Sequence, residues 1–362
     1  MDITDLFVQV KELGASDLHV TVGSPPTLRI NGSLVRLDVS PLSRDDTHTM
    51  LYDILTDEQK ARFEATHDLD CSFELGGVGR FRVNAFLQRL GEGMVLRFIP
   101  SAIRSLDDLL MPPILKELAL KDRGLVLVTG PTGSGKSTTL AAMVDHMNNH
   151  REDHIITIED PIEFIHEHKK CNVNQREVGS HTESFAIALR SALREDPDVI
   201  LVGEMRDHET VAQALTAAET GHLVLSTLHT NSAAQTISRI VDVFPQHQQE
   251  QIRVQLAEVL LGVIAQTLLP TLDGVSQVAA LEVMVATAAV RNLIRENKIH
   301  QLPSAIQTGA RDGMQSLDQS LKTLVKTKRI THEEAMRHAV EKQAFSQDAP
   351  GVGEYAEAST PR

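Results

Sequence analysis

Hydrophobic and polar positions alternate along much of the first part of the chain. In one such run Phe81 and Val83 share one face of a predicted strand, and Arg82 lies on the other. An Asn-Gly dipeptide between two further runs is typical of a tight hairpin turn. The pattern predicts a small α+β domain over residues 1–100, followed by a Pro-containing linker over 101–117.

A different pattern begins near residue 118, where apolar runs without alternation are separated by segments of helical period. These runs are GLVLVTG, HIITIED, DVILVGE and HLVLSTLH. Such runs are typical of a parallel sheet covered by helices on both faces, so the expected fold class is α/β. We expect a P-loop core over 118–280 and a helical region over 281–344, with LAEVLLGVIAQTLL as a buried helix.

Composition restricts the classes of function. The chain has 49 acidic and 35 basic residues, a net charge of −14, no Trp and two Tyr. A net negative charge does not attract nucleic acid or anionic lipid to the surface as a whole, although local basic patches could still bind either. Two distant cysteines and an acidic N-terminus favour a reducing cytosol over export. The segment 345–362, rich in Gly, Pro and Ser, is predicted to be disordered.

One motif predicts a phosphate site. GPTGSGKST fits the P-loop pattern and stands between a predicted strand and a predicted helix. Lys136 would neutralise the β- and γ-phosphates of ATP, and the hydroxyl of Ser137 would ligate Mg²⁺. The full pattern in this context disfavours the alternative, an ordinary glycine-rich turn. The predicted nucleotide-binding residues are Gly130, Pro131, Thr132, Gly133, Ser134, Gly135, Lys136, Ser137 and Thr138.

Carboxylates follow two of the predicted strands. Glu204 ends DVILVGE, and Gly203 stands where many NTPases have the Walker B Asp, so Glu204 alone would hold or polarise the Mg²⁺-water system. Glu159, Asp160 and Glu163 follow the strand that ends in ITIED. Because the carboxyl ends of parallel strands face the ligand crevice, one of these acids could orient the attacking water. For each acid alone, a helix cap or a solvated loop is an equal alternative.

Two histidines flank the run LVLSTL. A strand would place His229 at its carboxyl end, beside the P-loop, where an imidazole could contact the γ-phosphate. His222 would lie at the other end, more than about 20 Å away. We therefore expect the two rings to have different roles, and a hydrogen-bonded residue at a strand end is the alternative for each.

A third cluster, HEHKKC, contains His166, His168 and Cys171. These residue types bind zinc, but no second group at zinc-like spacing follows. We expect a solvated loop here.

In this order, GPTGSGKST, ITIEDPIEF, DPDVILVGEMRD and TGHLVLSTLHT resemble the Walker A, Asp box, Walker B and His box of the secretion-type ATPases of type II secretion and type IV pili. With SDLHVTVGSPPTLRINGSL, NQREVGSHTESF and MQSLDQSL, the resemblance spans residues 3–344 and is strongest to the twitching-motility retraction ATPases. AVRNL resembles the Ala-Ile-Arg-Asn-Leu motif of that branch, with Val290 in place of Ile. The resemblance implies a PAS-like first domain, a RecA-like second domain with a helical C-terminal part, and a homohexamer that holds ATP between domains.

The resemblance also implies roles for single residues. Glu163 is expected to be the catalytic glutamate, Glu204 the Walker B acid and metal ligand, and His229 a phosphate sensor. Arg82 and Arg97 would approach the phosphates, although strand patterning alone leaves surface charge or hairpin pairing open for both. The residues expected to couple hydrolysis to movement are Glu159, Asp160, His222, Ala289, Val290, Arg291, Asn292 and Leu293.

The function implied by the resemblance is a cytoplasmic ring motor at the inner membrane that uses Mg-ATP to withdraw pilin subunits through a membrane platform protein. A paralogous retraction ATPase is a further candidate partner, and no nucleic acid is expected. An accessory or assembly motor of the same superfamily is the nearest alternative, although AVRNL and the compact first domain argue against assembly. From other classes, a RecA-like nucleic-acid translocase and a regulatory ATP-binding module are the alternatives.

Overall fold

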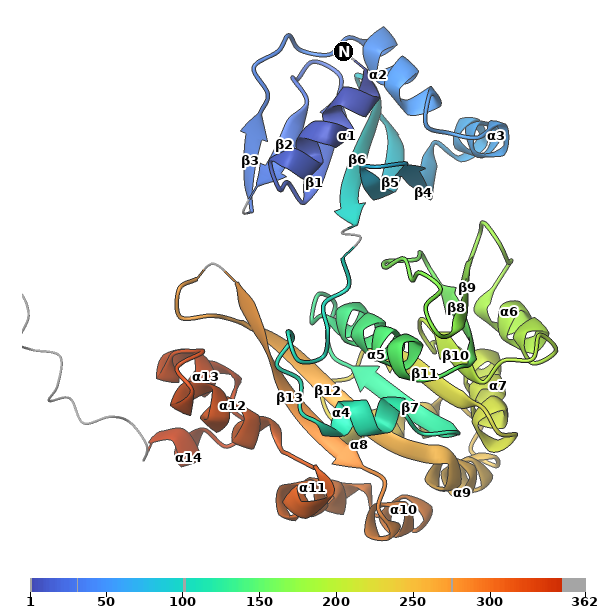
Figure 1. Cartoon of the computed structure of the whole chain (residues 1–362), viewed down its shortest axis with the longest axis vertical. Coiled ribbons are helices and arrows are strands. Elements are labelled where there is room, and N and C mark those ends of the chain that lie inside the picture. Colours follow the sequence, from blue (N-terminus) through green and yellow to red (C-terminus); the bar gives the residue numbers. More distant parts are fainter. Residues whose placement is uncertain (1, 31, 100–101, 275, 347–362) are drawn as a thin grey trace, which may run out of the picture. The chain divides into compact units, whose positions relative to one another are not determined.

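The computed structural model describes residues 2–30, 32–99, 102–274 and 276–346. The chain forms two compact units (Figure 1). The first contains the described residues up to Ile103 together with Pro161–Ile165, and the second contains Arg104–Asp160 and the chain from His166 onward. The Asp-box segment that holds Glu163 therefore groups with the first unit, although it lies within the sequence of the second.

The first unit is an antiparallel sheet covered on one face by helices. Its strand order is β3-β2-β1-β6-β5-β4. Phe81 and Val83 are fully buried, Arg82 is exposed, and the Phe81 ring stacks on Phe7 of α1 at 4.3 Å, so the predicted alternation is confirmed. The elements are α1 (Ile3–Glu12), β1 (Asp17–Thr21), β2 (Thr27–Ile30), β3 (Ser33–Arg36), α2 (Arg44–Tyr52), α3 (Asp57–Thr66), β4 (Asp68–Leu75), β5 (Gly79–Gln88) and β6 (Gly91–Ile99).

The second unit contains a seven-stranded sheet of order β13-β12-β7-β11-β10-β8-β9. All neighbouring pairs are parallel except β12 with β13. The strands are β7 (Gly124–Thr129), β8 (His154–Glu159), β9 (Asn172–Glu177), β10 (Val199–Val202), β11 (Leu223–Leu228), β12 (Leu260–Pro270) and β13 (Gln277–Val285). The predicted α/β fold class is confirmed, and β7, β10 and β11 are buried along their whole length.

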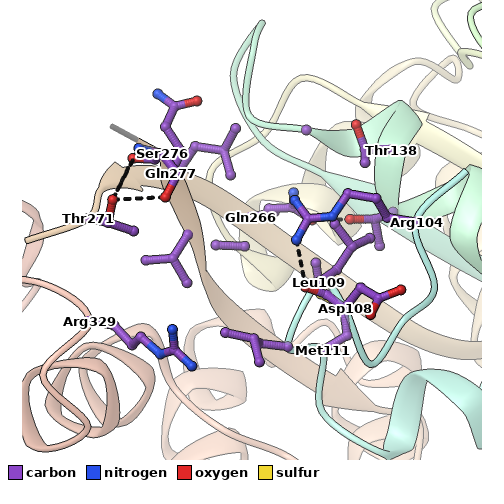
Figure 2. A pocket seen from close by; sticks show the side chains of 16 residues that line it. Arg104, Asp108, Leu109, Met111, Thr138, Gln266, Thr271, Ser276, Gln277 and Arg329 are labelled. Atoms are coloured by element: carbon purple, nitrogen blue, oxygen red, sulfur yellow. Dashed lines mark hydrogen bonds between the residues drawn. The ribbon is translucent and has the colours of Figure 1, made fainter. Parts of the chain in front are cut away.

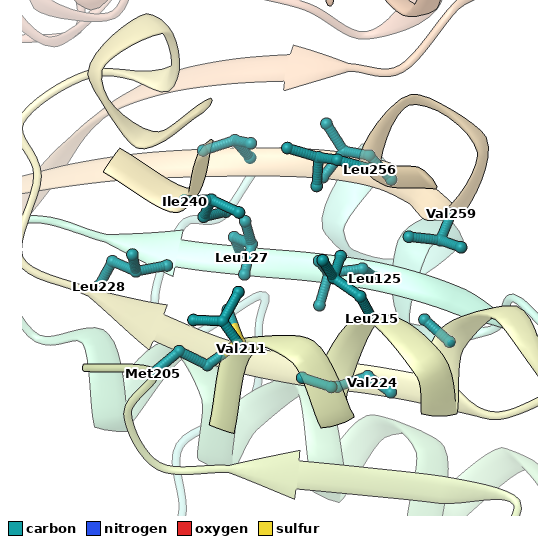
Figure 3. Close-up of a cluster of buried hydrophobic side chains, with 14 of the residues drawn as sticks. Leu125, Leu127, Met205, Val211, Leu215, Val224, Leu228, Ile240, Leu256 and Val259 are labelled. Atoms are coloured by element: carbon teal, nitrogen blue, oxygen red, sulfur yellow. The ribbon is translucent and has the colours of Figure 1, made fainter. Parts of the chain in front are cut away.

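Helices cover both faces of this sheet. The helices are α4 (Ile114–Ala119), α5 (Lys136–His150), α6 (Phe185–Ala192), α7 (His208–Glu219), α8 (Ala233–Asp242), α9 (Gln249–Val259), α10 (Ala288–Arg295), α11 (Leu302–Thr308), α12 (Leu317–Lys326), α13 (His332–His338) and α14 (Lys342–Ser346), with short 3₁₀ turns at Ile299–Gln301 and Ala310–Asp312. Figure 3 shows one core, in which side chains of β7 and β11 meet those of α7, α8 and α9. None of the described helices is long and apolar enough to cross a membrane.

The prediction of a buried helix over LAEVLLGVIAQTLL is wrong. Helix α9 ends at Val259, and the chain continues directly as β12. Strand β12 lies between β7 and β13, and its residues contribute to the cores on both faces of the sheet. Most of them are buried, so the sequence has no alternation that would distinguish this strand from a buried helix. Strand β13 also crosses the predicted boundary between residues 280 and 281, and the helical region begins later, with α10.

Two other boundaries differ from the expectation. Leu106 and Met111 of the predicted linker are buried in the second unit, and α4 begins at Ile114, before the linker was expected to end. Phe345, in the segment predicted to be disordered, is 1% exposed and packs in a small core with Leu321. Residues 347–362 of that segment lie outside the described residues.

Candidate active site

The P-loop connects the buried strand β7 to α5. Gly133 and Gly135 have φ angles of 77° and 83°, in the left-handed region that favours glycine. Helix α5 begins at Lys136, so its first amide N–H groups lie at the end of the loop. The predicted strand, loop and helix are therefore present, with the geometry that lets backbone amides bind an anion.

The Lys136 ammonium is held against the loop. Its Nζ donates to the carbonyl oxygens of Gly130 and Pro131, at 2.9 and 3.1 Å, and the residue is 9% exposed. A cation over the loop supplies the charge that a triphosphate requires.

Gln266 of β12 also contacts the P-loop, and sequence reasoning missed it. Its Nε2 donates to the Ser134 carbonyl at 2.6 Å, and its Oε1 accepts from Thr139 Oγ1 at 2.8 Å. The only sequence signal was a polar amide within a largely apolar run. Because this run was predicted to be a helix, no contact between Gln266 and the P-loop was expected.

Glu204 lies just after β10 and is held by two neighbours. Its Oε1 is 2.7 Å from Arg206 Nε and 3.2 Å from His229 Nε2. Burial opposes ionisation of Glu204, but the hydrogen bond from Arg206 and the charge of His229 outweigh it and hold the pKa of the carboxyl below its usual value. The Glu204 side chain is therefore expected to remain ionised at neutral pH. Arg206 was not predicted, although a cation two positions after Glu204 is visible in the sequence.

Gly203 has little room for a side chain. A Cβ there would lie 3.2 Å from Ile158 O and 3.3 Å from the Cα of Glu159. The backbone at the end of β8 therefore packs so closely on Gly203 that it disfavours an Asp side chain at this position.

The P-loop, Glu204 and His229 converge at one edge of the sheet, as predicted. The Gly130 amide donates to Leu228 O, directly before His229, at 3.3 Å. The Met205 amide donates to Thr227 O at 3.2 Å, which links the end of β10 to the end of β11.

His222 lies at the other end of β11, where its carbonyl accepts from Gly124, the first residue of β7. Its Nδ1 is 2.9 Å from Ala217 O, near the C-terminus of α7. The two histidines thus have different partners, and the hydrogen-bonded strand end proposed as the alternative for His222 is present.

The Asp box is divided between the two units. Glu159 ends β8, accepts from Thr157 Oγ1 at 2.6 Å and from Gln175 Nε2 at 3.2 Å, and Asp160 is exposed. Glu163 is exposed and belongs to the segment that groups with the first unit. Its predicted role at the phosphates therefore stays a prediction.

Arg82 and Arg97 face each other directly across β5 and β6. Arg97 Nε donates to Asp17 at 2.9 Å, whereas Arg82 is 4.0 Å from Asp70. Burial raises the pKa of Asp17, but the hydrogen bonds from Ser16 and Arg97 outweigh it and lower the pKa overall. Each arginine has a carboxylate neighbour on the strand to its outer side, Asp17 of β1 for Arg97 and Asp70 of β4 for Arg82.

AVRNL forms the first part of α10. Val290 is fully buried, Ala289 and Asn292 are exposed, and Leu293 is partly buried. The guanidinium of Arg291 donates to Ala286 O at 2.9 Å, to Ala257 O at 2.5 Å and to Glu258 O. The last two carbonyls belong to the final turn of α9, so Arg291 joins two helices of the same chain.

The HEHKKC segment is not a solvated loop throughout. His166 is 9% exposed, its Nδ1 has no hydrogen-bond partner among the described residues, and burial lowers its pKa to about 4. Cys171 is also buried, and the Val173 amide donates to Nδ1 of His168 at 3.0 Å. In the described part of the chain no group of three His, Cys, Asp or Glu residues could hold a metal.

A pocket of about 500 Å³ opens beside the helix end of the P-loop, within the second unit (Figure 2). Arg104, before α4, lies across it and donates to Asp108 O at 2.7 Å. The lining includes Gly135, Thr138, Gln266, Leu268, Gln277 and Arg329. A mixed apolar and polar pocket next to a phosphate loop has the character of a small-molecule site.

Comparisons with known proteins agree with this geometry. The type IV pilus retraction ATPase PilT of Pseudomonas aeruginosa is 56% identical over 94% of this chain and 98% of its own length. The type IV pilus ATPase PilU of the same organism is 43% identical over 94% of this chain and 89% of its own length. A crystal structure of the pilus retraction motor PilT with bound ADP matches with a TM-score of 0.90 and 49% identity, over 96% of this chain and 99% of that one.

These similarities confirm the predicted resemblance to pilus retraction ATPases, and with it nucleotide binding. A family model described as Type II/IV secretion system protein matches residues 2–354. The chain belongs to this family of secretion and pilus ATPases.

Proposed function

We propose that this chain is a hexameric motor that couples Mg-ATP hydrolysis to retraction of a type IV pilus. The observation that carries the proposal is the P-loop with Glu204 and His229 at one sheet edge, in a chain 56% identical to a pilus retraction ATPase. We expect the motor to act in the cytoplasm, on an inner-membrane platform protein. A paralogous ATPase is a further candidate partner.

The nucleoside half of ATP would occupy the pocket beside Gly135 and Thr138. The phosphates would lie on the loop amides, where Lys136 would exchange its bonds to the Gly130 and Pro131 carbonyls for phosphate oxygens. Because the pocket and the P-loop share Gly135, one nucleotide can reach both.

The residues present fit Mg²⁺. Ser137 and the ionised Glu204 offer oxygen donors, which this hard cation prefers, and a P-loop metal takes most of its other ligands from phosphate and water. When bound, Mg²⁺ would neutralise charge on the β- and γ-phosphates. Glu204 would orient the metal-bound water, and His229, bonded to Glu204, would sense the γ-phosphate.

Glu163 and the two arginines are proposed to act on the phosphates that the second unit binds. Glu163 would accept the proton of the attacking water, and Arg82 and Arg97 would stabilise the charge that develops on the transferred group. Their cross-strand register supports this role, because directly opposite residues share one face of the sheet and present both guanidinium groups there.

The test is a strain that lacks the gene, with surface pili counted and surface spreading measured. Excess pili with lost spreading would support retraction, whereas bald cells would mean that the motor assembles the fibre. An accessory motor of the same superfamily is the second candidate, and for that role a clean deletion would leave retraction partly intact. Strong stimulation of the purified ATPase by single-stranded DNA would instead support a nucleic-acid translocase.

A further inference from the structure

Gln266 is a buried amide to which the proposed chemistry gives no role. It is 3% exposed and bonds to the P-loop on one side and to α5 on the other. We propose that Gln266 is a positioning residue, which fixes the P-loop backbone in the form that binds phosphate. The inference rests on the proposed function of this loop.

The bonding pattern requires an amide. Nε2 must donate to the Ser134 carbonyl at 2.6 Å, and Oε1 must accept from the Thr139 hydroxyl at 2.8 Å. Only a side chain that carries a donor and an acceptor at this spacing makes both bonds. Ser134 lies within the loop and Thr139 in the first turn of α5, so one side chain joins the two parts that surround the phosphate position.

Two glycines of the P-loop pattern are shaped by the same residue. A Cβ on Gly130 would lie 2.2 Å from the main-chain oxygen of Gln266, and a Cβ on Gly135 would lie 2.8 Å from its side-chain Nε2. No ordinary side chain is tolerated at such distances. The loop backbone therefore packs closely on residue 266, with Gly130 against its main chain and Gly135 against the glutamine side chain.

Gln266 also lines the pocket proposed for the nucleoside, which suggests a different role, direct contact with the base (Figure 2). Its two polar atoms are both bonded to protein groups, which favours positioning over base recognition. Gln277 lines the same pocket from the first position of β13, where it pairs with Pro270. It provides a matched control for a contact with the nucleoside alone.

The experiment measures binding of Mg-pyrophosphate and of Mg-ADP to the full chain and to Gln266→Leu, Gln266→Glu and Gln277→Leu. Pyrophosphate uses the loop but not the pocket. Loss of one buried hydrogen bond corresponds to about a tenfold loss of affinity or more, so both Gln266 variants should weaken both ligands to that extent. Gln277→Leu should weaken Mg-ADP and leave Mg-pyrophosphate within about twofold.

Thr139 provides a second route if a Gln266 variant does not fold. Thr139→Val removes one bond while keeping the shape, and Thr139→Ser keeps the hydroxyl, so the first should weaken pyrophosphate binding more than the second. In Gln266→Leu/Thr139→Val the fold-loss of pyrophosphate affinity should be smaller than the product of the two single fold-losses, since each single variant removes the Gln266–Thr139 bond.

The outcomes separate this inference from the proposed function. Wild-type chain that binds no Mg-ADP would reject the nucleotide site itself. Wild-type chain that binds both ligands, with pyrophosphate affinity unchanged in Gln266→Leu and Thr139→Val, would reject only the positioning role. Loss of Mg-ADP but not of pyrophosphate in Gln266→Leu would also reject it and would assign Gln266 to the base.

Discussion

The imidazole Nε2 of His229 lies 3.2 Å from Oε1 of Glu204. The same oxygen is 2.7 Å from Arg206 Nε, so one carboxylate oxygen links the end of β10 to the end of β11. These contacts hold the pKa of Glu204 low against its burial, which keeps the group charged. Glu204 is thus better suited to orient a metal-bound water than to accept a proton.

Replacement of Glu204 should therefore stop turnover without unfolding the site. Glu204→Ala removes the partner of His229 and Arg206, and we expect kcat to fall by about 100-fold or more, as for loss of a preorganised transition-state contact. Steady-state ATPase kinetics and Mg-ADP binding on the same preparation check this, with the oligomeric state followed by light scattering. Undiminished ATP turnover in Glu204→Ala would contradict the proposed role of Glu204.

Gly203 should not accept the Asp found in other NTPases. A side chain would press on Ile158 O and on the Cα of Glu159, and overpacking of this kind costs about 1–3 kcal/mol. Gly203→Ala should lower the free energy of unfolding in urea by about that amount. Gly76→Ala is the control, because a Cβ there meets nothing within 4 Å. Equal stability of the two variants would contradict the packing argument.

His166 should make the protein sensitive to mild acid. Its pKa is about 4 in the folded protein against an ordinary value of 6.5, so between these values the unfolded state binds a proton that the folded state does not. Stability should fall as pH drops from 6.5 to about 4, by up to about 3 kcal/mol from this group. His166→Leu should lose that part of the slope. Parallel urea titrations at pH 7.5 and 4.5 test it, and an unchanged slope would rule it out.

Arg291 should stabilise the folded chain, because it bonds to the C-terminal carbonyl groups of α9. Arg291→Ala removes a charged donor from Ala257 O and Glu258 O at the end of α9, and we expect a loss of about 2 kcal/mol in thermal unfolding. Arg291→Lys should recover only part of it, because an ammonium lacks the planar fork. Arg295→Ala, at an exposed position of the same helix, should cost less than about 0.5 kcal/mol. Similar losses for residues 291 and 295 would refute the capping role.

Much of the second unit could be predicted because its motifs stand at strand ends. The runs that became β7, β8, β10 and β11 have no polar alternation, and in a parallel sheet this places Glu204, His229 and the P-loop at one edge. The exposure of Arg82 on one face of β5 could be predicted from the two-residue alternation of apolar and polar positions along that strand. These predictions needed only local periodicity and the rule that carboxyl ends converge.

The parts that could not be predicted depend on contacts between distant residues. Strand β12 has the composition of a buried helix, and only its pairing with β7 and β13 decides its conformation. Without that pairing Gln266 had no visible partner. Phe345 and His166 were misjudged because a polar stretch follows each of them in the sequence, whereas burial depends on what packs against the side chain.

The P-loop, the pocket, Glu204 and His229 all belong to the second unit, whereas Glu163, Arg82 and Arg97 belong to the first. On the proposed roles, binding of the nucleotide needs residues of the second unit alone, whereas turnover needs residues of both units. A substitution in the first unit could then slow the motor without changing the ATP concentration that it requires, but a substitution in the second unit could change both.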